Sequence, residues 1–334
     1  MSEDQVQTDQ QFSVREVPWM KLGHLVDKPV TAKEAASMAG LDFDVELCDV
    51  GVIVQDLTDT TYKNAFPESS TRAGTYRPIP SRKAIIARDN GDFMGFASSK
   101  MYNTLQYSEA FDFMDTLGAP YVAAGGLRKR RQGFMVVKPD LELNVIGGED
   151  PHELYAVLRT SHDCSRGVEV SVMPLRQRCM NQLTLRSFSK DANYRWSIKH
   201  TSTMHGKLKE AQNSLARLVT YKARFEAIAA RLVEVDVTED KARNMLKIVI
   251  PMPIGKTERT EQQWTDRIDS IVQLWQTSPT VAYAGTGWGL LNAVSEHYEW
   301  CRTGGTAESR FLNALEGETH KKINKMTGLL LSAH

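Results

Sequence analysis

The sequence predicts an α+β fold, in which a mixed antiparallel, β-rich N-terminal half with hairpins and a long helix precedes a helical C-terminal half. Two observations predict it. Short apolar runs bounded by turn residues recur up to about residue 200, and apolar residues at helical spacing dominate after it. Strands followed by segregated helices are typical of α+β rather than of doubly wound α/β proteins.

The first elements are marked by caps and turns. Residues 31–40 predict a short helix, with Thr31 and Glu34 at capping-box positions and Gly40 as its stop. The Asn-Gly pair at 90–91 predicts the corner of a hairpin. In chain order, the expected elements are a helix at 31–40, strands at 45–55, 82–88 and 93–98, a helix at 108–117, and strands at 119–127, 133–138, 155–159, 167–173 and 195–200.

Residues 74–80 contain Pro78 and Pro80 and are expected to be irregular. From residue 206 the sequence predicts helices, at 206–235, 238–249, 258–275, 286–300 and 307–331. The predicted organisation is therefore a disordered acidic tail at 1–15, a β-rich core with the basic hairpin and long helix at 16–235, and a helical region at 236–334.

The composition is that of a globular protein, with 334 residues of which 41% are hydrophobic and 25% charged. Its four cysteines include no C-x-x-C pair, which argues against a zinc ribbon or a disulfide framework and fits a cytoplasmic protein. No apolar run of about 18 residues is present, so no membrane span is expected. The first residues lack the apolar core of a signal peptide.

The formal net charge is zero, from 41 Lys plus Arg and 41 Asp plus Glu, but the charges are unevenly distributed. Residues 1–60 carry 4 positive and 12 negative residues, a net of −8, and residues 171–231 carry 12 and 3, a net of +9. A basic segment of this kind is typical of a surface that binds a polyanion. A solvated helix face, balanced in space by the acidic N-terminal region, explains the counts equally well.

A second basic feature is the run Arg128, Lys129, Arg130 and Arg131, which the predicted strands 119–127 and 133–138 place at the tip of a hairpin. Basic residues of the middle segment, with aromatic residues among them, are the other candidates, because cations neutralise phosphates and exposed aromatic rings stack on unpaired bases. These candidate DNA-binding residues are Arg176, Arg178, Arg195, Trp196, Lys199, His200 and Lys207. For Trp196, core packing is favoured over base stacking.

The sequence gives no specific enzymatic signal. Residues 255–257 (Gly-Lys-Thr) resemble the end of a phosphate-binding loop, but Ile250 stands where that motif needs glycine, and a helix cap at Thr257 explains them better. The glycine-rich stretch at 285–289 does not match G-x-G-x-x-G, and a cap at Thr286 is favoured. The histidines have no metal-ligand spacing, so neither a metal nor a cofactor is expected.

The chain resembles a family of phage and plasmid proteins catalogued as domain of unknown function 932. The motifs that carry the resemblance are Val17-Pro18-Trp19, Leu22-Gly23, 31–41, Gly95, Tyr102, Gln106, Glu109-Ala110-Phe111, Ala124-Gly125-Gly126-Leu127, Arg176, Cys179, Asn181-Gln182-Leu183, Lys199-His200-Thr201, Gly285-Thr286, Trp288 and Asn292-Ala293-Val294. Family members usually have His-Gly where this chain has Met20-Lys21. The resemblance implies a phage or mobile-element protein in a bacterial cytoplasm.

More distantly, a strand-rich half with a basic hairpin, followed by a long helix, resembles phage single-strand annealing recombinases of the Red-beta and RecT type. This resemblance implies a non-catalytic protein that binds single-stranded DNA and promotes annealing as a ring or filament of identical subunits. Further partners would be a phage exonuclease or a host single-strand-binding protein. The alternative is a non-enzymatic phage structural or host-interaction protein whose basic patch binds an acidic protein partner.

Overall fold

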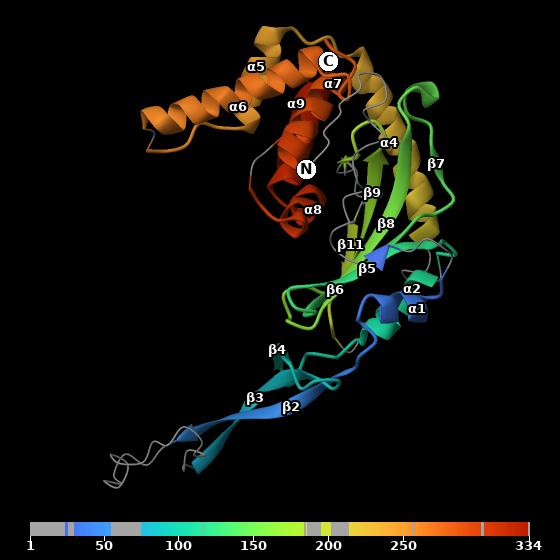
Figure 1. Ribbon diagram of the computed structural model, residues 1–334, viewed down its shortest axis with the longest axis vertical. Helices are drawn as coiled ribbons and strands as arrows, with labels where there is room; N and C mark the ends of the chain where they lie inside the picture. The colour runs from blue at the N-terminus through green and yellow to red at the C-terminus, as the bar shows by residue number, and fades with distance from the viewer. Residues whose placement is uncertain are drawn as a thin grey trace, which may run out of the picture.

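A computed structural model of the chain describes residues 24–25, 30–54, 75–115, 117–183, 185, 195–201, 214–255, 257–301 and 304–332. The predicted tail at 1–15 and the start of the predicted helix at 206–235 lie outside these residues. Figure 1 shows a body, in which helices flank a large sheet, and a three-stranded arm that extends from one end of it. The arrangement is α+β, as the sequence predicts, with antiparallel sheets in the N-terminal half and helices in the C-terminal half.

The large sheet is antiparallel and, within the described residues, contains eight strands. Its order is β1-β5-β6-β8-β9-β10, with β11 pairing with β9 and β7 with β8. The strands are β1 (His24–Leu25), β5 (Tyr121–Leu127), β6 (Gln132–Val137), β7 (Glu142–Leu143), β8 (His152–Ser161), β9 (Val168–Arg176), β10 (Asn181–Gln182) and β11 (Arg195–Ile198). All the strands expected between 119 and 200 are therefore present, and β8 and β9 are longer than the apolar runs that predicted them.

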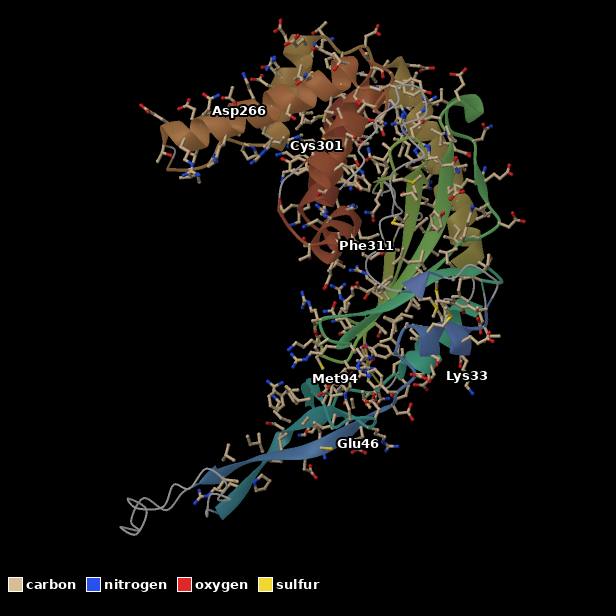
Figure 2. The ribbon with its side chains drawn as sticks, viewed as in Figure 1. Lys33, Glu46, Met94, Asp266, Cys301 and Phe311 are labelled. Atoms are coloured by element: carbon tan, nitrogen blue, oxygen red, sulfur yellow. The ribbon has the colours of Figure 1, made fainter. Side chains whose placement is uncertain are left out.

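Both faces of this sheet are covered. Successive residues of a strand point to opposite faces, so neighbouring residues of one strand show what covers each face. On β6, Met135 and Val137 belong to the core that includes α4, whereas Phe134 and Val136 belong to a second core with Phe311 of α8. Figure 1 shows α4 along one side of the sheet and α8 on the other, and Figure 2 labels Phe311 beside the strands. Burial on both faces explains why these strands are nearly continuous apolar runs.

The arm is an antiparallel sheet of β2 (Val45–Val54), β3 (Thr75–Ala87) and β4 (Phe93–Ser98). Among its described residues, the buried ones include Val45, Ile85 and Met94. Figure 2 labels Met94 at the end of the arm that meets the body. The expectation that 74–80 is irregular is wrong, because β3 runs through it from Thr75. Its prolines are tolerated because this part of β3 pairs with β2 alone, while β4 pairs only from Arg82 onward.

The helices follow the predicted caps. Thr31 and Glu34 form the expected capping box, and Thr257 and Thr286 cap the helices that follow them. The helices are α1 (Ala32–Met38), α2 (Tyr107–Asp115), α4 (Ser214–Glu234), α5 (Glu239–Val249), α6 (Glu258–Thr277), α7 (Gly287–Glu296), which continues as a π-turn at His297–Cys301, α8 (Ala307–Leu315) and α9 (Glu318–Ser332). No helix in the described parts of the chain is both long and apolar enough to cross a membrane.

The single helix expected over 307–331 is wrong, because α8 and α9 are separate helices. The break lies at Glu316 and Gly317, where the amide of Gly317 donates to the carbonyls of Leu312 and Asn313. A side chain on Gly317 would place its Cβ against the Oδ1 and Cα atoms of Asn313. The break turns the carboxylate of Glu316 toward the sheet, where it meets two arginines.

Candidate nucleic-acid interface

The basic run forms the turn between β5 and β6, as the sequence predicts. Arg130 fastens this turn to the arm, because its guanidinium lies 2.7 Å from the Asp89 carboxylate and 4.5 Å from the centre of the Phe43 ring. Its carbonyl also accepts a hydrogen bond from the Tyr107 hydroxyl at 2.7 Å. The other three cations of the turn, which we call the cationic tip, are exposed: Arg128, Lys129 and Arg131.

The backbone of this turn is strained. Arg128, Lys129 and Arg130 have φ angles of 50°, 58° and 64°, in the left-handed region that favours glycine. Each non-glycine residue there costs about 1 kcal/mol. The turn therefore exposes basic side chains in a conformation that lowers the stability of the fold. Backbone strain of this kind clusters at binding sites.

Two aromatic rings on the outer face of the arm lie beside the cationic tip. Phe93 and Phe96 are 39% and 55% exposed, and their ring centres are 4.8 Å apart. We call them the aromatic platform. The guanidinium carbon of Arg131 lies 5.9 Å from the centre of the Phe93 ring, so the tip and the platform are continuous.

A β-bulge creates this platform. Phe93 pairs with Ile86 and Gly95 with Ile85, so Met94 is an extra residue on β4 and is buried. Without the bulge, residues three apart in a strand would point to opposite faces, but the extra residue brings both rings outward. Sequence reasoning missed Phe93 and Phe96 as site residues, because strict alternation would have buried one of them.

Beyond Phe96 lies a hollow of about 420 Å³. It runs between the arm and the sheet, and Lys199, which the sequence singles out, is exposed at its rim. The residues that line it are Arg82, Phe96, Ser98, Met101, Tyr102, Cys164, Arg166, Gly167, Lys199, His200 and Thr201. Arg82 and Lys199 therefore extend the line of cations that begins at the tip.

Two stacked rings line the inner part of the hollow. The ring centres of Tyr102 and His200 are 5.3 Å apart, and His200 is only 7% exposed. The Nε2 atom of His200 lies 3.3 Å from the Thr160 hydroxyl. Burial lowers the pKa of His200 to about 4, so its ring is neutral at neutral pH. His200 is therefore a buried neutral ring rather than an exposed basic residue of this surface.

The arm reaches the body at Gly95. A Cβ atom on Gly95 would lie 2.8 Å from the Cα atom of Asp163 and 3.1 Å from the carbonyl oxygen of His162. Only glycine allows β4 to approach this turn so closely. The position of the platform relative to the hollow depends on this approach.

Replacing Gly95 by alanine is expected to destabilise the protein by about 1–3 kcal/mol, because the methyl group meets backbone atoms that cannot move aside. Urea denaturation measures the change. The matched control is Gly328→Ala in α9, where a Cβ atom meets nothing within 4 Å. The control should be neutral or slightly stabilising, and equal effects of the two substitutions would contradict the contact.

Arg176 is not part of this surface, and its prediction as a phosphate contact is wrong. Its side chain is 0% exposed, and its Nε atom donates to both carboxylate oxygens of Asp150 at 2.9 and 2.8 Å. Its two terminal nitrogens donate to the carbonyls of Thr280 and Val281 at 2.6 and 2.9 Å. The neighbouring Arg178 is 30% exposed and donates to the Glu149 carbonyl at 3.3 Å.

This buried ion pair joins the sheet to the helices. The Asp150 carboxylate also accepts a hydrogen bond from the Trp288 indole of α7 at 2.8 Å. Asn181 on β10 donates to the carbonyl of Asn292 at 3.4 Å and accepts from the Trp300 indole at 2.9 Å. Several residues that carry the family resemblance thus meet at this junction, where they serve the fold.

The remaining predicted residues are only partly described. Arg195 and Trp196 belong to β11 and pair with Ser171 and Val170 of β9, but the structure does not describe their side chains. Lys207 lies outside the described residues. The cations that the structure brings together are therefore those of the tip and of the hollow.

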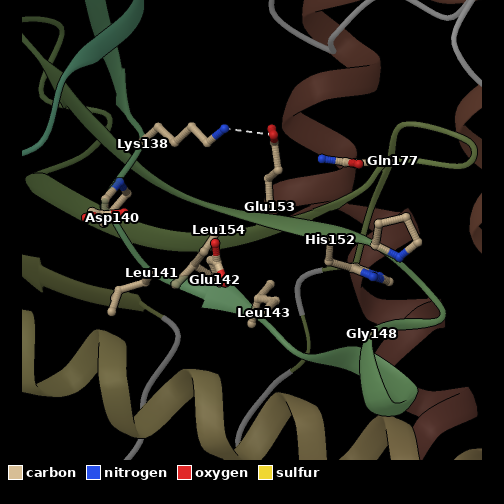
Figure 3. A pocket seen from close by; sticks show the side chains of 12 residues that line it. Lys138, Asp140, Leu141, Glu142, Leu143, Gly148, His152, Glu153, Leu154 and Gln177 are labelled. Atoms are coloured by element: carbon tan, nitrogen blue, oxygen red, sulfur yellow. Dashed lines mark hydrogen bonds and ion pairs between the residues drawn. The ribbon is translucent and has the colours of Figure 1, made fainter.

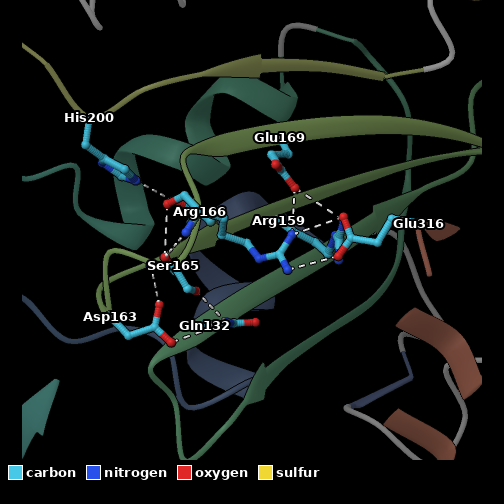
Figure 4. A network of polar contacts seen from close by, with 10 residues as sticks. Gln132, Arg159, Asp163, Ser165, Arg166, Glu169, His200 and Glu316 are labelled. Atoms are coloured by element: carbon cyan, nitrogen blue, oxygen red, sulfur yellow. Dashed lines mark hydrogen bonds and ion pairs between the residues drawn. The ribbon is translucent and has the colours of Figure 1, made fainter. Parts of the chain in front are cut away.

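Arg166, which lines the hollow, belongs to a four-charge network (Figure 4). Arg166 lies 2.7 Å from Glu169 and 2.9 Å from Glu316, and Arg159 lies 3.3 and 2.8 Å from the same two carboxylates. Burial would raise the pKa of Glu316, but hydrogen bonds and charge from the two arginines hold it far below its ordinary value. Because both arginines are neutralised, we do not count Arg166 among the cations that face a ligand.

A second hollow, of about 370 Å³, lies near β7 (Figure 3). Lys138 is paired there with Glu153 at 2.7 Å, and Asp140 and Glu142 add two more carboxylates. This lining would repel a phosphate. Among the described residues, no group of three or more His, Cys, Asp or Glu side chains could hold a metal ion.

Three buried histidines give the stability a predictable pH dependence. Burial lowers the pKa values of His152, His162 and His200 from 6.5 to about 4, about 3 and about 4. Below pH 6.5 the unfolded chain therefore takes up protons that the folded chain does not, and the free energy of unfolding should fall by about 2 kcal/mol per histidine by pH 5. Urea denaturation at pH 7 and pH 5 tests this.

The control for this prediction is His162→Phe. The two ring nitrogens of His162 have no hydrogen-bond partner among the described residues, and its neighbours are Phe43 and Tyr107. An apolar ring should be tolerated at pH 7 and should make the protein about 2 kcal/mol more stable than the wild type at pH 5. An unchanged pH dependence would show that His162 is not a buried neutral histidine.

Comparison with protein families matches residues 97–322 to the family described as domain of unknown function (DUF932). Comparisons with curated proteins and with solved structures found no match. The family match spans 226 of the 334 residues and includes the cationic tip, the sheet–helix junction and the lining of the hollow except Arg82 and Phe96. The chain therefore belongs to the DUF932 family.

Proposed function

We propose that the protein binds single-stranded DNA and promotes strand annealing as an oligomer, as a non-catalytic protein of a phage or mobile element in the host bacterial cytoplasm. One observation carries the proposal: exposed cations and exposed aromatic rings form one continuous line across the arm and the body. The line runs through Arg128, Lys129, Arg131, Phe93, Phe96, Arg82 and Lys199.

This line suits a strand whose bases are unpaired. Cations at its two ends would neutralise phosphates and release their counterions, which makes binding tight at low salt. The rings between them would stack on bases, at about 1–3 kcal/mol for each base. A duplex hides the faces of its bases, so the platform favours single strands.

Annealing and self-assembly extend this proposal by analogy. The order of a strand-rich half with a basic hairpin and then a long helix resembles the Red-beta and RecT type, in which subunits hold one strand for its complement. The arm is consistent with self-association, because Leu47, Val52, Ile53 and Ile79 are exposed on it. A phage exonuclease or a host single-strand-binding protein would be a further partner.

The second candidate function is docking of an acidic protein partner. The observation that favours it is the apolar character of the same surface, where Phe96 and Met101 are 55% and 71% exposed. Large exposed apolar side chains beside cations also mark protein interfaces. The two functions therefore compete for one site and need a direct test.

An annealing assay separates them. Two complementary, dye-labelled DNA strands are mixed with and without the purified protein, and particle size is followed by light scattering. The proposed function predicts faster pairing and large protein–DNA particles, with no nucleotide added. An unchanged pairing rate, together with a single stoichiometric protein partner that competes for this surface, would instead support the docking function.

A further inference from the structure

We infer that the hollow beside Phe96 is a pocket for one unpaired nucleobase, which gives the protein a base preference in addition to general affinity for single strands. This inference rests on the proposed function and specifies its ligand. The residues that carry it are Phe96, Met101, Tyr102, Lys199 and His200.

The walls fit a planar, apolar face. Phe96 and Met101 are exposed at the mouth, and the Tyr102 ring lies further in, where it stacks on His200. Its volume of about 420 Å³ falls in the range of small-molecule sites. Because Phe96 also belongs to the aromatic platform, a strand that stacks on the platform has its next base at the mouth of the hollow.

A polar atom that needs a partner lies behind the inner wall of the hollow. The Tyr102 hydroxyl is buried and makes no hydrogen bond within the described residues. A buried polar atom left unsatisfied costs about 1–3 kcal/mol. The edge of a nucleobase carries donors and acceptors side by side, so a base in the hollow could give the hydroxyl a partner after a small rotation of the Tyr102 ring, while its face contacts the walls.

A phosphate fits the inner part poorly. The cations Arg82 and Lys199 belong to the lining, but the inner wall is made of a neutral phenol, Tyr102, and a neutral imidazole, His200. The side chain of Arg166 is already paired with two carboxylates. The arrangement therefore places the sugar-phosphate chain at the rim and the base inside.

The inference is tested with short single strands of about 12 nucleotides, a length within the usual range of binding sites. Homopolymers of each base and a fully abasic strand of equal length are compared at one salt concentration. Wild-type protein should bind its preferred homopolymer more tightly than the other homopolymers and the abasic strand. The variant Tyr102→Phe, which keeps the ring and loses only the hydroxyl, should reduce the preference between bases by about threefold to tenfold.

The matched control is Tyr298→Phe, which makes the same change at a buried tyrosine of the helical half. It should leave the preference unchanged, and circular dichroism checks that both variants are folded. If Tyr102→Phe keeps the wild-type preference, or if all homopolymers bind equally, the pocket inference is wrong while the proposed function stands. If no strand binds at low salt, the proposed function fails as well.

Discussion

Replacing Asp150 by alanine is expected to destabilise the protein by about 3–5 kcal/mol, because it leaves the Arg176 guanidinium buried without its counter-ion. Both side chains are 0% exposed. The substitution also removes the acceptor of the Trp288 indole, so it breaks the contact between the sheet and α7. Urea denaturation at pH 7 measures the loss.

The matched control is Asp269→Ala, which breaks an ion pair of similar length on the surface. Arg243 and Asp269 lie 2.6 Å apart, with side chains that are 34% and 51% exposed. Exposed pairs contribute little, so the loss should stay below about 1 kcal/mol. Equal losses from the two substitutions would contradict the structural role of Arg176.

Reversing the three charges of the cationic tip is expected to weaken binding of single-stranded DNA by about 100-fold or more at low salt. The variant is Arg128→Glu with Lys129→Glu and Arg131→Glu. Arg130 is left in place, because its contacts with Asp89 and Phe43 hold the turn against the arm. The salt slope is the slope of the logarithm of the binding constant against the logarithm of the salt concentration. Each lost phosphate contact should also lower its magnitude by about 0.7.

The control variant makes the same change in net charge elsewhere. Lys241, Lys247 and Arg259 are exposed on α5 and α6, which lie at the end of the body away from the arm (Figure 1). Reversing these three should leave most of the affinity and the salt slope intact. Equal losses from both triple variants would mean that net charge, rather than the tip, determines binding.

Local sequence signals predicted much of the fold. Capping residues located the starts of α1, α6 and α7, and the Asn-Gly corner located the β3–β4 hairpin. Two elements depended on tertiary contacts instead. The prolines of β3 are tolerated because that stretch is a sheet edge, and the break between α8 and α9 places Glu316 against two arginines of the sheet.

The candidate site was less predictable, because charge in a sequence does not show burial. Arg176 and His200 stand among exposed basic residues in the sequence, yet the first lies in an ion pair inside the fold and the second is a neutral ring. Phe93 and Phe96 were missed because a bulge, which no local residue pattern signals, turns both outward. The run at 128–131 was found because its charge and its hairpin are both local features.

Fluorescence anisotropy of a labelled single-stranded oligonucleotide, titrated with the wild-type protein over a range of salt concentrations, tests the central claim most directly. The line of cations and aromatic rings predicts tight binding at low salt that weakens steeply as salt increases. Three phosphate contacts from the cationic tip alone give a salt slope of about −2. A duplex of equal length should bind more weakly than the single strand. No binding at low salt, or equal binding of the duplex, would contradict the account.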